Sequence, residues 1–326
     1  MTESGDTPAD RPVTRAAAEA ARERLRGIAL RSPLLRLEHD GDVDVRVKLE
    51  NLQPIGSFKI RGAANKMLQL APDVLRRGVW TASAGNMAQG VAWCARRAGI
   101  ECTVVVPEHA SEAKLAAIRR LGARIETVTH EEFFETFATR RRPGLGGQFI
   151  HAFSDADVMA GNGTIALEIL EDLPDVRAIY VPYGGGGLSC GIAGVVREIA
   201  PHVRVIACEP ETAAPLAASL PGGVIVDAGF TPSFVDGAGG PRLYPEMFAL
   251  ARDVIAEAVA VPLGDVAAAL RLLAERAHVI AEGAGALAVA AALRGAEHGP
   301  VACVVSGGNI RADWVSTLLE GRQPSI

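Results

Sequence analysis

The sequence predicts an α/β fold in which parallel sheets are flanked by helices, and three observations support this prediction. First, short apolar and β-branched runs alternate with Ala-rich stretches of helical composition; the runs are VRVKLE, CTVVVPE, AIYVP, VRVIACEP and VACVVSGG. Second, the runs show little polar–apolar alternation, which is typical of strands buried on both faces. Third, turns rich in small residues follow several of the runs. Strand–helix–strand repetition of this kind indicates parallel sheets.

Composition and charge limit the class of protein. The chain has 326 residues, of which 49% are hydrophobic and 22% charged, which suffices for a substantial core in one large or two medium domains. The net charge of −5 offers no basic surface for nucleic acid or anionic lipid. No apolar run reaches the roughly 18–20 residues of a bilayer span, and the polar N-terminus lacks the apolar stretch of a signal peptide. We therefore expect a cytoplasmic protein without a nucleic-acid or membrane partner.

The predicted elements follow one another with one interruption. Residues 1–12 are rich in Pro, Asp and Thr and predict a frayed tail, whereas Ala and Arg dominate 15–31 and predict a helix. Strands and helices alternate after this helix. The segment 129–148 is acidic, then basic, then Gly-rich, and it interrupts the rhythm as a candidate boundary region.

The cysteines and histidines show no disulfide or metal pattern. The five cysteines are scattered among apolar neighbours and never form C-x-x-C, so we predict buried free thiols. The seven histidines show no H-E-x-x-H or paired spacing, so the sequence indicates no zinc site.

Three turns rich in small residues follow predicted strands, at residues 81–90, 181–191 and 304–309. In open α/β sheets, ligands bind at such turns, beyond the carboxyl ends of the strands. The second turn carries four consecutive glycines, Gly184 to Gly187, immediately before a predicted helix. Backbone without Cβ atoms at a helix N-terminus can wrap closely around an anion, so this loop favours a phosphate over a turn that serves packing alone.

Other interpretations of these motifs are weaker. The chain has no G-x-x-x-x-G-K-[ST] motif, and its two G-x-G-x-x-A matches, starting at Gly161 and Gly283, favour close helix packing over a dinucleotide. The sequence 187–191 also matches the G-x-S-x-G turn of serine hydrolases, with Ser189 as the nucleophile. Acids and histidines that could complete a triad follow in the right order: Asp227, Asp236, Asp253, and His278 or His298. The four preceding glycines favour phosphate binding instead.

Lysine is rare, which draws attention to each one. Only four lysines, namely Lys48, Lys59, Lys66 and Lys114, stand against 29 arginines. Lys59 lies between Phe58 and Ile60, on a Gly-Ser turn that opens a predicted helix. An apolar setting lowers the pKa of an amine and makes it a nucleophile toward aldehydes. From the residues alone, a Schiff-base lysine and a structural lysine both remain open.

Five short motifs follow one another along the chain. ENLQPIGSFKIRGA, SAGNMAQGVA, VPYGGGGLSCGIAG, EGAGALAVAA and VVSGGN span residues 50–309. In this order they resemble the threonine/serine dehydratase family of pyridoxal-phosphate enzymes. The resemblance implies the fold type II, tryptophan synthase β-like architecture with pyridoxal 5′-phosphate between two α/β domains. It also implies a large domain of 1–77 plus 154–326 and a small domain of 78–153.

The resemblance implies roles for individual residues. Lys59 would hold the cofactor covalently and, once released, act as the base at the substrate Cα. Asn86 would bond the 3′-oxygen, and Ser306 would face the pyridine nitrogen. The phosphate would rest on Gly184, Gly185, Gly186, Gly187 and Leu188, with Phe58 and Glu282 also at the cofactor. The substrate carboxylate would lie on Ser83, Ala84, Gly85, Asn86 and Met87.

These roles imply a lyase. A serine hydroxyl opposite the pyridine nitrogen makes the ring a weaker electron sink than an aspartate would, which suits rapid loss of a β-leaving group. The expected reaction is elimination of water from L-threonine or L-serine, giving a 2-oxo acid and ammonia. The partner would then be a small amino acid, and relatives of this kind are usually dimers or tetramers, so we expect a homo-oligomer.

Departures from the family pattern keep several alternatives open. Met87 replaces the usual histidine, and Tyr183 replaces a small aliphatic residue before the glycines, so a less common β-hydroxy amino acid is an alternative substrate. A serine racemase is disfavoured because Ala84 replaces the serine that acts as acid and base. Glu209 matches a cation-binding glutamate of the racemases, but Pro215 replaces its second ligand, so we expect no metal.

Two further alternatives are weaker. A β-replacement synthase of the same fold is disfavoured because SAGNMAQ replaces its T-S-G-N-T loop. A non-catalytic binding protein is disfavoured by the presence of Lys59, Asn86 and Ser306 together.

Overall fold

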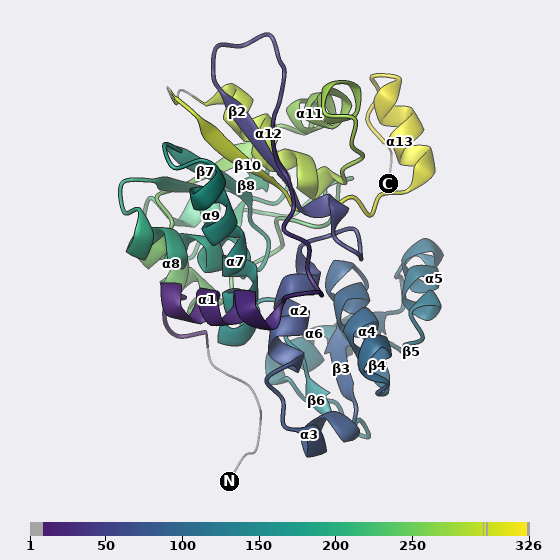
Figure 1. Ribbon diagram of the computed structural model, residues 1–326. Coiled ribbons are helices and arrows are strands. Elements are labelled where there is room, and N and C mark those ends of the chain that lie inside the picture. Colours follow the sequence, from purple (N-terminus) through teal and green to yellow (C-terminus); the bar gives the residue numbers. More distant parts are fainter. Residues whose placement is uncertain (1–8, 296, 298, 325–326) are drawn as a thin grey trace.

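The computed structural model describes residues 9–295, 297 and 299–324. It is an α/β structure with two sheets, as predicted (Figure 1). The first sheet has six strands in the order β1-β2-β10-β7-β8-β9, and all neighbours are parallel except β1 and β2. Its strands are β1 Leu34–Arg36, β2 Val45–Leu49, β7 Ala178–Pro182, β8 Arg204–Pro210, β9 Glu257–Val261 and β10 Val301–Val305.

The second sheet has four strands in the order β5-β4-β3-β6, all parallel. Its strands are β3 Val79–Ala82, β4 Cys102–Pro107, β5 Arg124–Val128 and β6 Gln148–Phe149. Every residue of the central strands β3, β7 and β10 is buried, which explains why these runs lack polar–apolar alternation. The four-stranded sheet lies within 79–149, and the division of the chain into domains at 78 and 153 stays a prediction.

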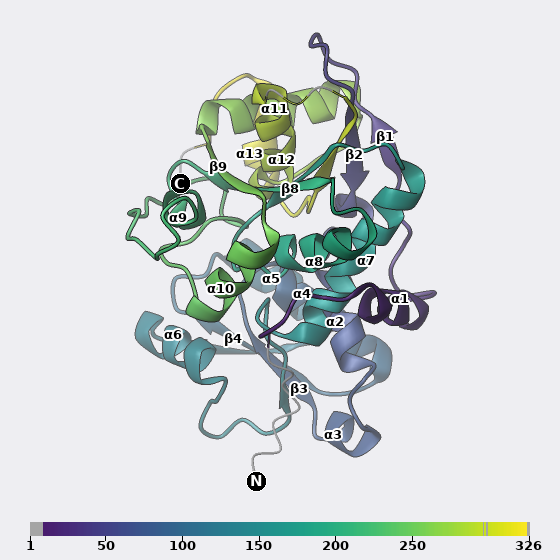
Figure 2. The ribbon, with the colours of Figure 1, turned by 90° about the vertical axis from the view of Figure 1, so that its left-hand side faces the viewer.

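The helices cover the sheets and fill the space between them (Figures 1 and 2). They are α1 Arg15–Arg24, α2 Lys59–Met67, α3 Pro72–Arg76, α4 Asn86–Ala98, α5 Glu112–Arg120, α6 His130–Thr139, α7 Ala156–Asp172, α8 Ser189–Ile199, α9 Pro215–Ser219, α10 Pro245–Val254, α11 Leu263–Arg276, α12 Gly283–Arg294 and α13 Ala312–Leu319, with the 3₁₀ turn η1 at Glu50–Leu52. None of the helices in the described part of the chain is long and apolar enough to cross a membrane.

Two sequence expectations need adjustment. The first helix ends at Arg24 instead of continuing to residue 31, and the chain then turns through Gly27 in the left-handed region at φ +72°. The segment 129–148 contains a regular helix, α6, whose Thr129 and Glu132 form a reciprocal capping box. The composition of this segment therefore differs from that of its neighbours, but the alternation of strands and helices continues through it.

Glycines bring three helices into backbone contact. A Cβ on Gly161 of α7 would overlap the carbonyl oxygen of Arg61 on α2, and a Cβ on Gly163 would lie 2.9 Å from the carbonyl oxygen of Gly191 on α8. The first G-x-G-x-x-A match therefore serves close helix packing, as predicted. The helices α2, α7 and α8 form one tightly packed stack, which lies between the two sheets in Figure 2. The five cysteines are buried free thiols, also as predicted.

Candidate active site

Lys59 is the first residue of α2, and the turn before it is attached to the loop that follows β10. Ser57 forms an isolated bridge with Gly307, and the Phe58 amide donates to the carbonyl oxygen of Ser306 at 3.0 Å. Gly56 permits this approach with φ +71°. The fold therefore brings the candidate lysine and Ser306 together across about 250 residues of sequence.

Among the residues that the structure describes, the Lys59 amine has a hydrogen-bond acceptor but no ion-pair partner. Its Nζ donates to the carbonyl oxygen of Ala152 at 2.7 Å and lies 5.1 Å from the centre of the Phe58 ring. Burial lowers the pKa of Lys59 to about 8, against the opposing influence of the Glu282 carboxylate. A substantial fraction of the amine is therefore unprotonated near neutral pH, as a nucleophile toward an aldehyde requires.

Asn86, Glu282 and Asn309 form a hydrogen-bonded chain. Asn86 Nδ2 donates to Glu282 Oε1 at 2.7 Å, and Asn309 Nδ2 donates to Asn86 Oδ1 at 2.7 Å. Burial, reinforced by the charge of Asp236, raises the pKa of Glu282 to about 7. Asn86 and Glu282 were predicted for the site, whereas Asn309, the last residue of the third predicted turn, was not.

The glycine loop leaves its backbone donors open. Within the described part of the chain, none of the amides from Gly184 to Ser189 has a hydrogen-bond acceptor. The loop precedes α8, whose dipole adds positive potential at the same end. Six consecutive free amides at a helix N-terminus fit an anion such as a phosphate group.

Packing accounts for some of the glycines. A Cβ on Gly185 would overlap the ring of Phe153, and a Cβ on Gly187 would lie 2.7 Å from the Phe153 Cα. Gly186 has φ +89°, while a Cβ on Gly184 would meet only ordinary contacts from 3.5 Å. Packing and phosphate binding are therefore compatible explanations for the glycines. The absence of side chains makes room for Phe153, and the amides stay free to bind an anion.

The segment after β6 connects the lysine to the glycine loop, and the sequence analysis missed it. Ala152 accepts from Lys59, and Phe153 lies against Gly185 and Gly187. His151 Nδ1 accepts from the amides of Phe153 at 3.2 Å and Ser154 at 2.8 Å, and burial holds the pKa of His151 well below its usual range. Its position in the sequence could have identified it, because it is a fourth turn beyond the carboxyl end of a parallel strand. Unlike the other three turns, it lacks glycine.

The loop predicted to take a substrate carboxylate divides between a cleft and the core. The Gly85 amide donates to Ser83 Oγ at 3.2 Å, and a Cβ on Gly85 would meet nothing within 4 Å. Ala84 lines a cleft of about 500 Å³. Met87 instead points into the hydrophobic core and is only 1% exposed.

The cleft lies between elements of the two sheets. Its lining includes Ala84 and Lys114 from the four-stranded part, and Asp236, Glu282 and Asn309 from the six-stranded part. The Nζ of Lys114 and Oδ2 of Asp236 form an ion pair of 2.6 Å across it. Glu282 and Asn309 of the hydrogen-bonded chain therefore face this cleft.

The arrangement required for a serine hydrolase is not formed. The buried Ser189 hydroxyl donates to the carbonyl oxygen of Pro182 at 2.9 Å, at the end of β7. His278 is exposed beyond α11, and His298 lies outside the described residues. Ser189 therefore closes the turn instead of facing a base.

Glu209 is bonded to backbone amides. Its two carboxylate oxygens accept from the amides of Leu216 at 3.1 Å and Ala217 at 2.8 Å, and burial raises its pKa to about 7. Among the residues that the structure describes, no group of three or more His, Cys, Asp or Glu side chains is arranged to hold a metal ion.

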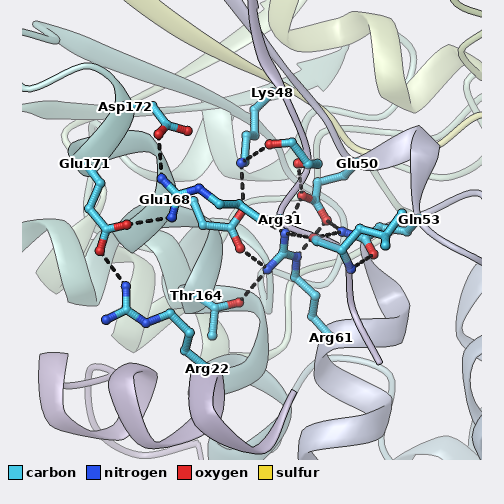
Figure 3. A network of polar contacts seen from close by, with 12 residues as sticks. Arg22, Arg31, Lys48, Glu50, Gln53, Arg61, Thr164, Glu168, Glu171 and Asp172 are labelled. Atoms are coloured by element: carbon cyan, nitrogen blue, oxygen red, sulfur yellow. Dashed lines mark hydrogen bonds and ion pairs between the residues drawn. The ribbon is translucent and has the colours of Figure 1, made fainter. Parts of the chain in front are cut away.

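A buried ionic network anchors α2 just beyond Lys59 (Figure 3). Arg61 forms ion pairs with Glu50 at 2.8 Å and Glu168 at 2.6 Å, and Lys48 pairs with Glu168 at 2.6 Å. All four side chains are buried, so two positive and two negative charges are neutralised inside the protein. At the other end of α2, Lys66 lies 2.9 Å from Asp155. Three of the four lysines thus have carboxylate partners, namely Lys48, Lys66 and, across the cleft, Lys114.

Comparison with known proteins defines the class that this site serves. A family described as pyridoxal-phosphate dependent enzyme matches residues 26–307, and the chain belongs to this family. The predicted cofactor is thereby confirmed as that of the family.

Individual relatives place the chain more narrowly. It is 41% identical over 310 residues to an L-threonine ammonia-lyase of Geobacter sulfurreducens, covering 93% of this chain and 77% of the relative. It is also 41% identical over 280 residues to an L-threonine ammonia-lyase of Thermotoga maritima, covering 85% and 70%. Within the pyridoxal-phosphate enzymes, the chain is therefore a lyase of the threonine/serine dehydratase family.

Solved structures agree on the fold. Maize serine racemase superposes with a TM-score of 0.85 at 29% identity, covering 93% of this chain and 95% of that one. The processed form of threonine deaminase isoform 2 from Solanum lycopersicum gives a TM-score of 0.83 at 29% identity, covering 98% of both chains. The predicted fold type II architecture is confirmed.

Proposed function

We propose that this protein eliminates water from L-threonine or L-serine, giving a 2-oxo acid and ammonia. The observation that carries the proposal is that the segment after β6 contacts both the candidate lysine and the glycine loop. Ala152 accepts from an amine of lowered pKa, and Phe153 packs on a loop with six free amides. The relatives named L-threonine ammonia-lyase support this reaction over others of the fold.

The residues present fit pyridoxal 5′-phosphate. Lys59 would hold it covalently, and the amides of Gly184 to Leu188 would bind its phosphate. Asn86 would bond the 3′-oxygen, Ser306 would face the pyridine nitrogen, and Phe58 and Glu282 would complete the surroundings. When bound, the cofactor supplies an electron-withdrawing ring that acidifies the substrate Cα–H.

Lys59 is proposed as the base. An amine whose pKa is about 8 exchanges protons readily near neutral pH, so it can take the Cα proton once the substrate amine has displaced it. The carbonyl oxygen of Ala152 holds Nζ in place by the 2.7 Å hydrogen bond. The loop Ser83 to Met87 is proposed to bind the substrate carboxylate.

Ser306 and Ala84 favour elimination over racemisation. Ser306 is buried directly after β10, and its hydroxyl cannot hold a proton on the pyridine nitrogen as an aspartate would. Ala84 lines the cleft and offers no group to return a proton to the opposite face of Cα. A homo-oligomeric assembly, a cytoplasmic location and the domain boundaries at 78 and 153 stay predictions.

A substrate panel tests the reaction. Purified protein loaded with pyridoxal 5′-phosphate is offered both enantiomers of threonine and serine and other β-hydroxy amino acids, and ammonia and 2-oxo acid are measured. We expect the highest kcat/KM for L-threonine or L-serine. Turnover confined to another β-hydroxy amino acid would replace the proposed substrate, and epimerisation without ammonia would replace the reaction. Borohydride reduction and peptide mass mapping should place the cofactor on Lys59.

A further inference from the structure

Tyr183 joins β7 to the glycine run, and its backbone is fixed on both sides. Its amide donates to the carbonyl oxygen of Cys208 at 2.8 Å, and its own carbonyl oxygen accepts from the Gly239 amide at 2.7 Å. The residue is only 1% exposed. The direction of its ring is therefore set by the fold and not by solvent.

The Tyr183 hydroxyl lies against the glycine loop. A Cβ on Gly186 would be 2.9 Å from this hydroxyl and 3.1 Å from the Met247 methyl. Gly186 is the loop residue with φ +89°, so the backbone conformation and the space for the hydroxyl both require glycine here. The loop is shaped around the tyrosine.

The hydroxyl has no hydrogen-bond partner in the described part of the chain. Its oxygen keeps some accessible surface, so it borders an opening at which phenylalanine would offer no hydrogen bond. The nearby carboxylates are engaged elsewhere: Glu209 accepts from two amides, and Glu246 accepts from the Ser154 hydroxyl at 3.1 Å. The hydroxyl is therefore left for a ligand.

Its charge state suits a donor. Burial and the neighbouring carboxylates hold the pKa of Tyr183 well above 10, so the hydroxyl keeps its proton throughout the working pH range. The six amides of the neighbouring loop, Gly184 to Ser189, are donors too, and they have no acceptor among the described residues. A ligand common to both must be an acceptor, and an anion satisfies both best.

We propose that the Tyr183 hydroxyl donates a hydrogen bond to the phosphate group that the glycine loop binds. Tyr183 adds one side-chain donor to a site that otherwise consists of backbone amides. The inference rests on the proposed function, because that function supplies the phosphate group.

Tyr183→Phe tests the proposal against a matched control. Tyr180 is also buried and lies three residues earlier on β7, with its hydroxyl beside Gly295 instead of the glycine loop. Protein freed of cofactor is titrated with pyridoxal 5′-phosphate and with pyridoxal, which lacks the phosphate, and the visible chromophore is followed. Tyr183→Phe should weaken pyridoxal 5′-phosphate binding roughly tenfold or more and leave pyridoxal binding unchanged. Tyr180→Phe should change neither.

The outcomes separate this inference from the function beneath it. If the wild-type protein forms no chromophore, the proposed function fails. If the wild type forms it and Tyr183→Phe binds pyridoxal 5′-phosphate equally well, the Tyr183 assignment fails alone. Equal weakening for both ligands also overturns it, because a contact with the phosphate cannot affect pyridoxal.

A measurement on the intact side chain covers the case in which Tyr183→Phe folds poorly. The chain has three tyrosines, so protein labelled with 3-fluorotyrosine gives three ¹⁹F resonances. Tyr180→Phe and Tyr244→Phe assign the third resonance by elimination. It should move when pyridoxal 5′-phosphate binds and stay in place when pyridoxal binds. A resonance that moves equally with both ligands, or with neither, contradicts the contact.

Discussion

Two regions of this molecule, the buried ionic network at α2 and the glycine loop before α8, treat their polar groups in opposite ways. In the network of Figure 3, the buried charges of Arg61, Lys48, Glu50 and Glu168 are all paired. In the glycine loop, six consecutive amides have no acceptor within the described chain. Because unpaired buried polar groups are unfavourable, the first region stabilises the fold and the second is completed by a ligand.

The contrast recurs within a single helix. Burial alone would lower the pKa of both Lys59 and Arg61. For Arg61 the charges of Glu50 and Glu168 more than offset it, so its pKa is raised, whereas the pKa of Lys59 falls to about 8. Two cations separated by one residue thus differ in function because one has carboxylate partners and the other has a carbonyl oxygen.

The largest expected effect comes from replacing Lys59, the cation without a carboxylate partner. Lys59→Ala should reduce 2-oxo acid formation by roughly 10³-fold or more, because it removes both the attachment point and the base. Stability should change little, since Lys59 loses only the bond to Ala152. Steady-state kinetics and thermal unfolding check the two parts. Substantial turnover in this variant would remove Lys59 from the reaction.

Arg61→Met tests the contribution of the buried ionic network to stability. It leaves two buried carboxylates without their shared partner, so the free energy of unfolding should fall by about 3–5 kcal/mol. The control is Arg15→Met, which removes an exposed pair with Glu19 and should change stability far less than Arg61→Met does. Denaturant unfolding of both variants gives the comparison. A loss equal to that of the control would show that the network contributes nothing special.

Substitutions within the loop separate packing from open donors. Gly185→Ala places a methyl group on the Phe153 ring, so it should destabilise the protein by about 1–3 kcal/mol and weaken cofactor binding. Gly184→Ala meets only ordinary contacts and serves as the control. Unfolding and cofactor titration are measured for each. Equal behaviour of the two variants would contradict the packing assigned to Phe153.

The unpaired state of Lys59 predicts a pH dependence. The unprotonated amine is the nucleophile, so the rate at which cofactor-free protein forms the chromophore should rise about tenfold per pH unit below pH 8 and level off above it. Stopped-flow absorbance between pH 6 and 10 measures this rate. A rise that continues to pH 10 would mean that burial does not lower the pKa of the amine.

Glu282 should make the stability of the protein depend on pH. Its pKa rises from 4.5 to about 7 on folding, so its contribution to stability is complete below the unfolded pKa and is lost as the pH rises through 7. Glu282→Gln should therefore flatten the decline in unfolding free energy between about pH 4.5 and 7, by at most about 1.4 kcal/mol per pH unit. Parallel curves for the variant and the wild-type protein would contradict the raised pKa.

The sequence predicts those parts of the molecule that depend on local pattern. Buried strands, the position of Lys59 at a helix start and the glycine loop after β7 could all be read from neighbouring residues. The antiparallel pairing of β1 could not, because strand direction depends on the path of the chain before β2. The turn at His151 was missed because its role depends on contacts with Lys59 and Gly185, which lie far away in sequence.

Met87 shows a further limit. Its place in the motif suggested an altered pocket, but the side chain points into the core. Motif position gives the backbone location of a residue, whereas the direction of its side chain follows from the packing of α4 against its neighbours.

The stack of α2, α7 and α8 has a consequence for how the protein acquires its cofactor. The lysine begins the first of these helices, the glycine loop precedes the last, and backbone atoms of the middle helix touch both. The distance between the point of covalent attachment and the anion cradle is thus built into the fold before any cofactor arrives. Pyridoxal 5′-phosphate should meet two binding elements that these helices already hold in place, so little ordering entropy is lost on binding.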